Sequence, residues 1–121
     1  MVKEFVKNLK DISFYKAPKG IAYRKMAVGS SIHPIEVDYV PVQKGKSIPG
    51  HIHEKSNAFV FILQGSGTVT LGTKTIPVTK DDIINIPCGT WHEFHASSLE
   101  DLVFLSIQNP PIGRDYLFRK D

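Results

Sequence analysis

Three histidines have residue types and spacing that suit a metal site. His51 and His53 follow a Pro49-Gly50 turn, and side chains two apart in an extended chain share one face, roughly 6.5–7 Å apart. His92 comes about forty residues later, after a Pro-Cys-Gly-Thr turn. Three neutral imidazole nitrogens suit a borderline divalent cation. On spacing alone, an incidental His-x-His pair remains an alternative.

The elements that must position these histidines are predicted to be β-strands. Helical periodicity is confined to Phe5, Val6, Leu9 and Ile12, which predict one short N-terminal helix. Elsewhere, apolar or alternating runs lie between Gly, Pro and Ser turns. The predicted strands cover residues 21–28, 35–42, 57–63, 68–71, 74–78, 82–86, 92–96 and 102–108. Many short strands without crossover helices indicate an all-β antiparallel sandwich or barrel.

Alternation within the strand at 57–63 predicts which side chains enclose the site. Ala58, Val60 and Ile62 share the inward face. Phe59 and Phe61 then face outward, where they can pack under the N-terminal segment or against a second subunit.

The same rule applied from His92 places Phe94 inward. Trp91 and Tyr39 are candidates for the pocket rim, with a core or interface role as the alternative. A pocket with these walls would be small and mostly apolar around one polar centre, which suits a compact metabolite.

Length and composition limit the class of protein. A chain of 121 residues with 41% hydrophobic and 22% charged residues fits one compact globular domain. Its longest apolar run, 58–63, is far shorter than the roughly 20 residues of a membrane span. The start of the chain has no apolar stretch typical of a signal peptide. With Cys88 as its single cysteine, we expect a cytoplasmic protein without membrane association.

The basic charge of the chain is concentrated at one end. The sequence pI is about 9.0. Residues 1–25 carry a net charge of +5, whereas the remaining residues carry −2. No zinc-finger spacing, RNP-like aromatic pattern or basic recognition helix accompanies this charge. We therefore expect a solvated basic face and no nucleic-acid partner.

Two segments around the histidines resemble the motifs of the cupin superfamily. The first motif is matched by Gly45, His51, His53, Ala58 and Gly65, and the second by Pro87, Gly89 and His92. The resemblance covers about residues 36–108. Cupins are jelly-roll β-barrels, also called double-stranded β-helices, so the resemblance implies that fold. It also implies a single cupin domain over 1–121, with a barrel core at about 36–108 and an N-terminal extension at 1–30.

The resemblance also implies a metal site. His51, His53 and His92 match the three histidine ligands of the family, which implies one divalent ion per chain, Fe, Zn, Ni, Mn or Cu. Ala58 stands where the motif usually has a glutamate ligand. Asp81 and Ala96 also depart from the motif, at positions that concern turn shape and barrel packing. Without a carboxylate, the ion would keep its full charge and favour anionic or chelating ligands.

Two functions are consistent with these residues. The family includes three-histidine iron oxygenases of thiols and diketones, which implies a mononuclear non-haem, dioxygenase-like enzyme or an isomerase for a small chelating metabolite. The alternative is a non-catalytic small-molecule-binding module, which the missing glutamate supports. In either case a homodimer is expected, because outward phenylalanines would leave one subunit with an apolar face.

Five other polar residues are weighed as site candidates. Glu54 follows His53 directly and is expected at the surface. Asn57 would approach the metal only if its loop bulges. His95 lies on the opposite face from His92 and is expected in a solvent or dimer contact. His33 has no evident partner in the sequence, and Cys88 lacks an adjacent base, so a structural thiol is expected.

Overall fold

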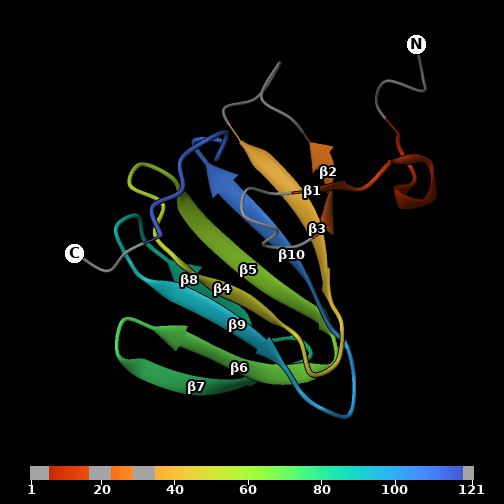
Figure 1. The fold of residues 1–121 in the computed structure, drawn as a ribbon. Coiled ribbons are helices and arrows are strands. Elements are labelled where there is room, and N and C mark those ends of the chain that lie inside the picture. Colours follow the sequence, from red (N-terminus) through yellow and green to blue (C-terminus); the bar gives the residue numbers. More distant parts are fainter. Residues whose placement is uncertain (1–5, 17–22, 29–34, 119–121) are drawn as a thin grey trace.

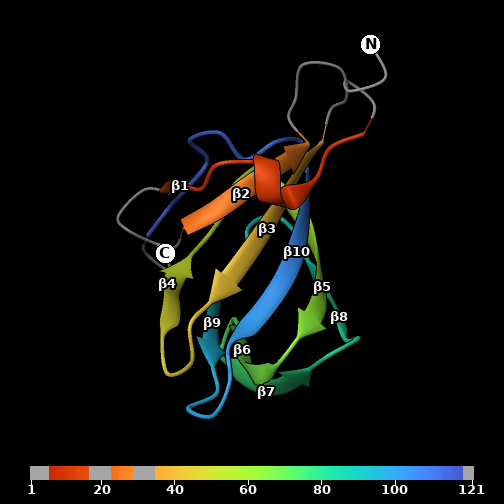
Figure 2. The ribbon, with the colours of Figure 1, turned by 90° about the vertical axis from the view of Figure 1, so that its right-hand side faces the viewer.

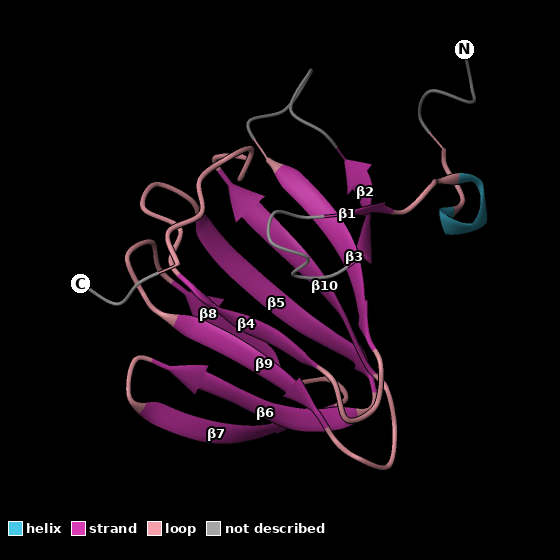
Figure 3. Ribbon diagram, viewed as in Figure 1, coloured by secondary structure: helices cyan, strands magenta, loops and turns pink. Residues whose placement is uncertain are grey.

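The computed structural model describes residues 6–16, 23–28 and 35–118. These residues are almost entirely β-structure, with one short helical turn near the N-terminus (Figure 3). The strands are β1 (Tyr15–Lys16), β2 (Tyr23–Val28), β3 (Glu36–Val42), β4 (Ser47–His51), β5 (Asn57–Gln64), β6 (Ser66–Leu71), β7 (Lys74–Thr79), β8 (Ile83–Ile86), β9 (His92–Ala96) and β10 (Leu102–Asn109). The predicted all-β class is confirmed.

The strands form two antiparallel sheets that face each other (Figure 1). One sheet has six strands in the order β1-β2-β3-β10-β5-β8, and the other has four in the order β4-β9-β6-β7. From β3 onward the chain crosses repeatedly between the sheets, which is the topology of a jelly roll. Figure 2 shows β3, β10 and β5 side by side in one wall.

The core lies between the two sheets and follows the predicted alternation. Ala58, Val60 and Ile62 are buried, whereas Phe59 is 54% exposed. Phe94 faces inward from the opposite sheet and stacks on Phe104, with ring centroids 4.7 Å apart. Because burying one such side chain stabilises a fold by about 1.5–3 kcal/mol, this apolar layer holds the two sheets together.

Gly65 permits the chain to cross from β5 to β6. Its φ is +87°, and a Cβ at this position would lie 1.8 Å from the carbonyl oxygen of Asp101. Any other residue would therefore clash with the backbone and be strained. The close approach of the Asp101 backbone therefore explains why the motif has a glycine at this position.

The prediction of an N-terminal helix is wrong for the residues that are described. Leu9–Asp11 form a single 3-10 turn, which the side chain of Asn8 caps by accepting a hydrogen bond from Lys10 N. Val6 is 71% exposed, so the apolar stripe has no surface to pack against at that point. Phe5 lies outside the described residues. Within the described ranges, no helix has the length and apolar character needed to cross a membrane.

Strand β4 was not predicted, because Pro49-Gly50 was interpreted as a turn. Both residues lie inside β4, an edge strand of the four-stranded sheet, where a proline is tolerated. The register with β9 shifts between Ile48 and His51, as in a β-bulge. The bulge turns both Ile48 and His51 inward although they are three residues apart.

Candidate metal centre

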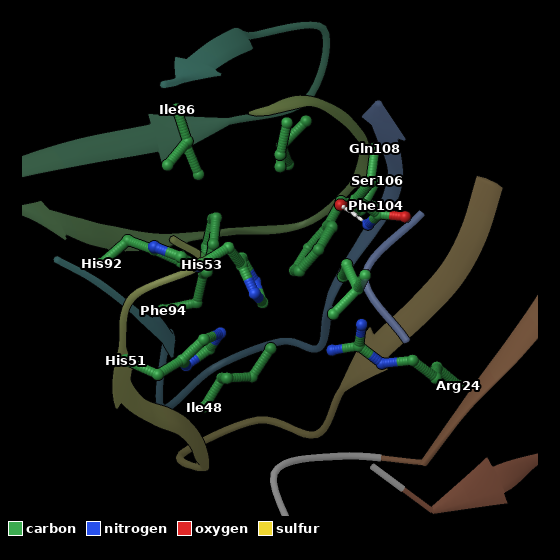
Figure 4. Close-up of a pocket in the computed structure, with 13 residues that line it drawn as sticks. Arg24, Ile48, His51, His53, Ile86, His92, Phe94, Phe104, Ser106 and Gln108 are labelled. Atoms are coloured by element: carbon green, nitrogen blue, oxygen red, sulfur yellow. Dashed lines mark hydrogen bonds between the residues drawn. The ribbon is translucent and has the colours of Figure 1, made fainter. Parts of the chain in front are cut away.

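The three predicted histidines come together inside the barrel. His51 ends β4, His53 follows two residues later, and His92 begins β9 directly opposite His51. All three are buried, and one ring nitrogen from each lies within 4.8 Å of the other two. Figure 4 shows the three rings on one side of a shared cavity. The structure therefore assembles a set of donors that could hold a metal ion.

Each imidazole is fixed by a backbone carbonyl. The Nδ1 atom lies 2.8 Å from Pro49 O in His51, 2.6 Å from Asp115 O in His53 and 2.9 Å from Thr90 O in His92. A carbonyl oxygen only accepts hydrogen bonds, so each Nδ1 carries the proton and donates. The lone pair is left on each Nε2, which is the tautomer that a metal ligand needs.

Burial keeps these imidazoles neutral. It lowers the pKa of His51 to about 3 and the pKa of His92 to about 4, and the neighbouring histidines act in the same direction. It also lowers the pKa of His53, against the effect of the Asp115 carbonyl. At neutral pH the three rings therefore offer lone pairs without first losing a proton.

Asp115 holds the loop that carries His53. Its carboxylate accepts hydrogen bonds from the backbone N–H groups of Glu54, Lys55 and Ser56, at 2.8, 2.8 and 3.0 Å. These donors lower the pKa of Asp115 against the opposing effect of partial burial. Because Asp115 O also accepts from His53, one residue fixes both the loop and the ring.

The walls of the cavity match part of the prediction. Ala58, Val60 and Phe94 line it together with the histidines. The methyl group of Ala58 faces the cavity where the cupin motif usually has glutamate. The space open to the centre of a water-sized molecule is about 20 Å³, so the cavity is small. We call this space the histidine cavity.

Two predicted rim residues lie elsewhere. Trp91 packs on Gly50 and donates from Nε1 to Glu93 Oε2 at 2.9 Å. Tyr39 alternates with the buried Asp38 and Val40 and so faces the outer side of β3. Neither residue lines the histidine cavity, so the rim prediction is wrong.

Four other candidates are placed away from the histidine cavity. Glu54 is exposed, as predicted, and Asn57 accepts a hydrogen bond from Cys88 N at 2.9 Å. Cys88 is an exposed free thiol. His95 contacts Ser47 Oγ at 2.6 Å and Glu93 Oε1 at 3.5 Å on the outer face of β9.

The remaining candidate, His33, lies outside the described residues.

A C-terminal segment, residues 112–118, covers the histidines and was not predicted. Leu117 exchanges two backbone hydrogen bonds with Ile52, at 2.7 and 2.8 Å. The Tyr116 ring lies 4.9 Å from the ring of His53 between centroids and stacks on Phe118. No local signal in the sequence points to this contact, because it depends on where the chain returns after β10.

A second buried polar group occupies β1, β2, β3 and β10. We call it the carboxylate cluster, and it consists of Tyr15, Arg24, Glu36, Asp38 and Gln108. Arg24 Nη1 lies 3.5 Å from Asp38 Oδ2. The Tyr15 hydroxyl donates to Asp38 at 3.1 Å and lies 3.4 Å from Glu36. The amide orientation that satisfies both ends of Gln108 has it donate to Asp38 Oδ2 at 3.2 Å.

Burial raises the pKa of Asp38 to about 8, and Glu36 acts in the same direction. Sequence reasoning missed the two acids of the carboxylate cluster, although a signal was present. Strand alternation could have found both acids, because they share the parity of Val40 and Val42, which face the core.

Known proteins similar to this chain were found at both the sequence and the structure level. A protein of Hypocrea virens named a probable oxidoreductase is 41% identical over 73 residues, which are 58% of this chain and 33% of that protein. An uncharacterized protein of Streptomyces coelicolor is 35% identical over 51 residues, which are 42% of this chain and 48% of that protein. The chain thus spans less than half the length of either relative.

Solved structures share the fold. A predicted oxalate decarboxylase of Thermotoga maritima superposes with a TM-score of 0.78 at 19% identity, covering 87% of this chain and 98% of that one. A cupin-2 domain of Rhodospirillum rubrum superposes with a TM-score of 0.70 at 27% identity, covering 82% and 68%. Residues 38–108, more than half of the chain, match the cupin domain family. With the jelly roll and both histidine motifs in place, this chain belongs to the cupin family.

Proposed function

We propose that His51, His53 and His92 hold one divalent metal ion, and that the protein acts on a small chelating metabolite. The observation that carries this proposal is the convergence of three buried imidazoles whose Nδ1 atoms are all bound to carbonyl oxygens. This arrangement directs three lone pairs toward one region. A cluster of histidines that only filled the core would not need one tautomer in every ring.

The donor set fits a borderline divalent ion. Three neutral nitrogens suit Fe²⁺, Zn²⁺, Ni²⁺, Mn²⁺ or Cu²⁺ and leave the charge of the ion uncompensated. When bound, such an ion supplies Lewis acidity and, for iron, manganese or copper, electron transfer. The chain itself orients the rings through the carbonyls, keeps them neutral by burial and surrounds them with apolar side chains. The methyl group of Ala58 leaves space where a glutamate ligand would lie.

Among reaction classes, we propose oxidation of the metabolite, with isomerisation as the other enzymatic class. The name of the Hypocrea virens relative, a probable oxidoreductase, supports oxidation, although this chain matches only 33% of that protein. A non-catalytic binding module remains the second candidate. It is favoured by one observation: among the described residues, no carboxylate lines the histidine cavity to serve as a general base.

Metal analysis of the purified protein tests the site. We expect about one ion per chain in the natural protein and at least a tenfold loss in His92→Ala, since two imidazoles bind far more weakly than three. His95→Ala is the matched control, because His95 lies on the same strand but faces outward. Full metal occupancy in a folded His92→Ala protein would show that the assignment is wrong.

Oxygen uptake by the metal-loaded protein then separates the two candidate functions. A panel of thiols, diketones and hydroxy acids covers the chelating classes. Uptake that needs both metal and substrate supports an oxidising enzyme. Binding of panel members without any turnover supports the non-catalytic module.

We also propose that two copies pair through the outer face of β5 and β8. Phe59 is 54% exposed and Ile83 is 71% exposed on these adjacent strands. Light scattering should give a dimer mass, and Ile83→Lys should give a monomer. Leu99→Lys is the control, because Leu99 is 85% exposed but lies in the loop before β10.

A further inference from the structure

Arg24 is a buried cation on the wall of the histidine cavity. It lies on β2, is 4% exposed and lines the cavity together with the three histidines. Figure 4 shows its guanidinium extending into the cavity from the side opposite the imidazoles. Since His51 and His92 belong to the four-stranded sheet and Arg24 to the six-stranded sheet, the two kinds of group face each other across the barrel.

The hydrogen-bonding capacity of Arg24 is only partly used. A guanidinium carries five N–H donors. One terminal nitrogen lies 3.5 Å from Asp38 Oδ2, and within the described part of the chain Nε has no hydrogen-bond partner. A buried donor without a partner is unfavourable, because it has lost its hydrogen bonds to water. An acceptor that enters the cavity would recover this cost.

The charges nearby leave Arg24 available to an anion. Arg24 lines the cavity, whereas Asp38 and Glu36 do not. Both acids are also engaged elsewhere: Tyr15 donates to Asp38 at 3.1 Å, and Ile112 N donates to Glu36 Oε1 at 3.1 Å. On the cavity side, the guanidinium therefore has no anionic neighbour among the described residues.

The shape of the cavity limits what such an anion can be. The walls between the histidines and Arg24 are apolar, formed by residues such as Val60, Phe104 and Ile112. Polar groups are concentrated at two ends, with the imidazoles at one and Arg24, Ser106 and Gln108 at the other. About 20 Å³ is open to the centre of a water-sized molecule, so a long or branched ligand does not fit.

We propose that Arg24 binds the carboxylate of a short 2-hydroxy or 2-oxo acid, which is held between this guanidinium and the histidine end of the cavity. The inference rests on the proposed metal site, because the 2-hydroxy or 2-oxo oxygen of the acid faces the three imidazoles. A guanidinium matches a carboxylate through parallel N–H donors, which makes the contact selective for the ionised acid over a neutral analogue of the same size.

Glycolate and glycolamide test this assignment as a matched pair. They have the same size and both carry a hydroxyl and a carbonyl oxygen, but only glycolate is an anion. Each is titrated into the Co²⁺-loaded protein, and binding is followed by the visible absorption of Co²⁺ and by calorimetry. The readout is affinity, so no turnover is needed.

The main variant is the double substitution Arg24→Gln, Asp38→Asn, which removes the cation together with the acid that it contacts. We expect glycolate to bind about 10- to 100-fold more weakly to it, as for loss of a charge-assisted hydrogen bond. Glycolamide should change less than about twofold. Lys25→Gln is the control, because Lys25 is the next cation on β2 but donates to Leu9 O at 2.6 Å, away from the cavity. It should change neither affinity.

Arg24→Lys is a second variant that tests the same contact if the double variant does not fold. It keeps the charge but removes the planar fork, so a smaller, severalfold loss for glycolate is expected. If glycolate and glycolamide both bind and the Arg24 variants weaken them equally or not at all, the assignment of Arg24 is wrong while the metal site stands. If Co²⁺ loads but glycolate does not bind, the assignment is also wrong. If Co²⁺ does not load, the proposed metal site itself fails.

Discussion

The barrel encloses two polar regions that burial affects in opposite ways. Among the histidines, burial lowers the pKa values and leaves neutral bases with free lone pairs. In the carboxylate cluster, burial raises the pKa of Asp38 and favours its neutral acid. In both regions the charged form is disfavoured by lost hydration. The histidine region is therefore ready to bind a cation. The carboxylate cluster beside it already contains one, the guanidinium of Arg24.

The two regions also differ in what holds them in place. Each histidine is fixed by a backbone carbonyl, so its position follows from the strands and loops. The carboxylate cluster is held by side chains that bond to one another, such as Tyr15 and Gln108 on Asp38. Backbone anchoring leaves the functional atom free, whereas mutual bonding uses up most donors and acceptors. Arg24 and Gln108 are the members of the cluster that also line the histidine cavity.

The largest effect is expected from a substitution that breaks the carboxylate cluster. Asp38→Ala should lower the free energy of unfolding by about 3–5 kcal/mol, because it leaves the buried donors of Arg24, Tyr15 and Gln108 without their acceptor. Urea unfolding at pH 7 measures the loss. Arg24→Met combined with Asp38→Leu should recover much of it, since no buried charge remains. A loss below about 1 kcal/mol in Asp38→Ala would contradict a structural role for this pair.

The pH dependence of stability should separate the two regions in the metal-stripped protein. The histidines have an ordinary pKa of 6.5 but titrate near 3 and 4 at His51 and His92 when folded. The unfolded chain therefore binds more protons below pH 6.5, and stability falls as the pH is lowered from there.

Asp38 acts in the other direction. Its pKa is 3.8 ordinarily and about 8 when folded, so its stabilising proton is lost as the pH rises through about 8. We expect a stability maximum near pH 6.5, with changes on the order of 1–2 kcal/mol on either side. Urea unfolding from pH 4.5 to 9 measures both limbs, and Asp38→Asn should remove the alkaline limb and make the acid limb steeper. A profile that this substitution leaves unchanged would show that Asp38 does not retain its proton.

Ala58→Glu would make the histidine region resemble the carboxylate cluster by adding a carboxylate to it. Ala58 is buried and lines the histidine cavity, so a glutamate can reach the ion as a fourth ligand. Metal retention against a chelator should rise 10- to 100-fold, and glycolate affinity should fall. Ala58→Gln is the control for bulk alone. The metal-free stability must be measured too, because a buried glutamate without its ion is costly. Unchanged glycolate affinity in a folded, loaded variant would show that residue 58 does not face the metal.

The smallest effect concerns the loop that carries His53. Asp115→Ala removes the acceptor for three backbone N–H groups and should lower metal affinity about tenfold, as outer-shell substitutions commonly do. Stability should fall by about 1 kcal/mol, since exposed donors regain water. Asp101→Ala is the control, because Asp101 accepts from Lys44 N at 2.8 Å in another loop. Equal metal affinity in both variants would show that the His53 ring does not need this loop.

Strand positions and the three histidines could be predicted because both depend on short-range spacing. The alternation of Ala58 to Ile62 has the period of a half-buried strand, and the structure shows that burial. Strand β4 was missed because Pro49-Gly50 usually marks a turn, and only pairing with β9 makes it a bulged edge strand. The helix expected near Leu9 reduces to one turn because its apolar residues have no partner surface there.

The sequence by itself determined an all-β chain, the inward parity of its strands and three histidines spaced as ligands. Local periodicity and motif spacing are properties of neighbouring residues, so they can be read before folding. Only the tertiary structure decided which atom of each histidine is free, through partners as distant as Asp115 for His53. It also decided that Arg24 faces the histidines. Both contacts depend on the register of strands and the return path of loops, because a shift of one residue would turn each side chain to the opposite face.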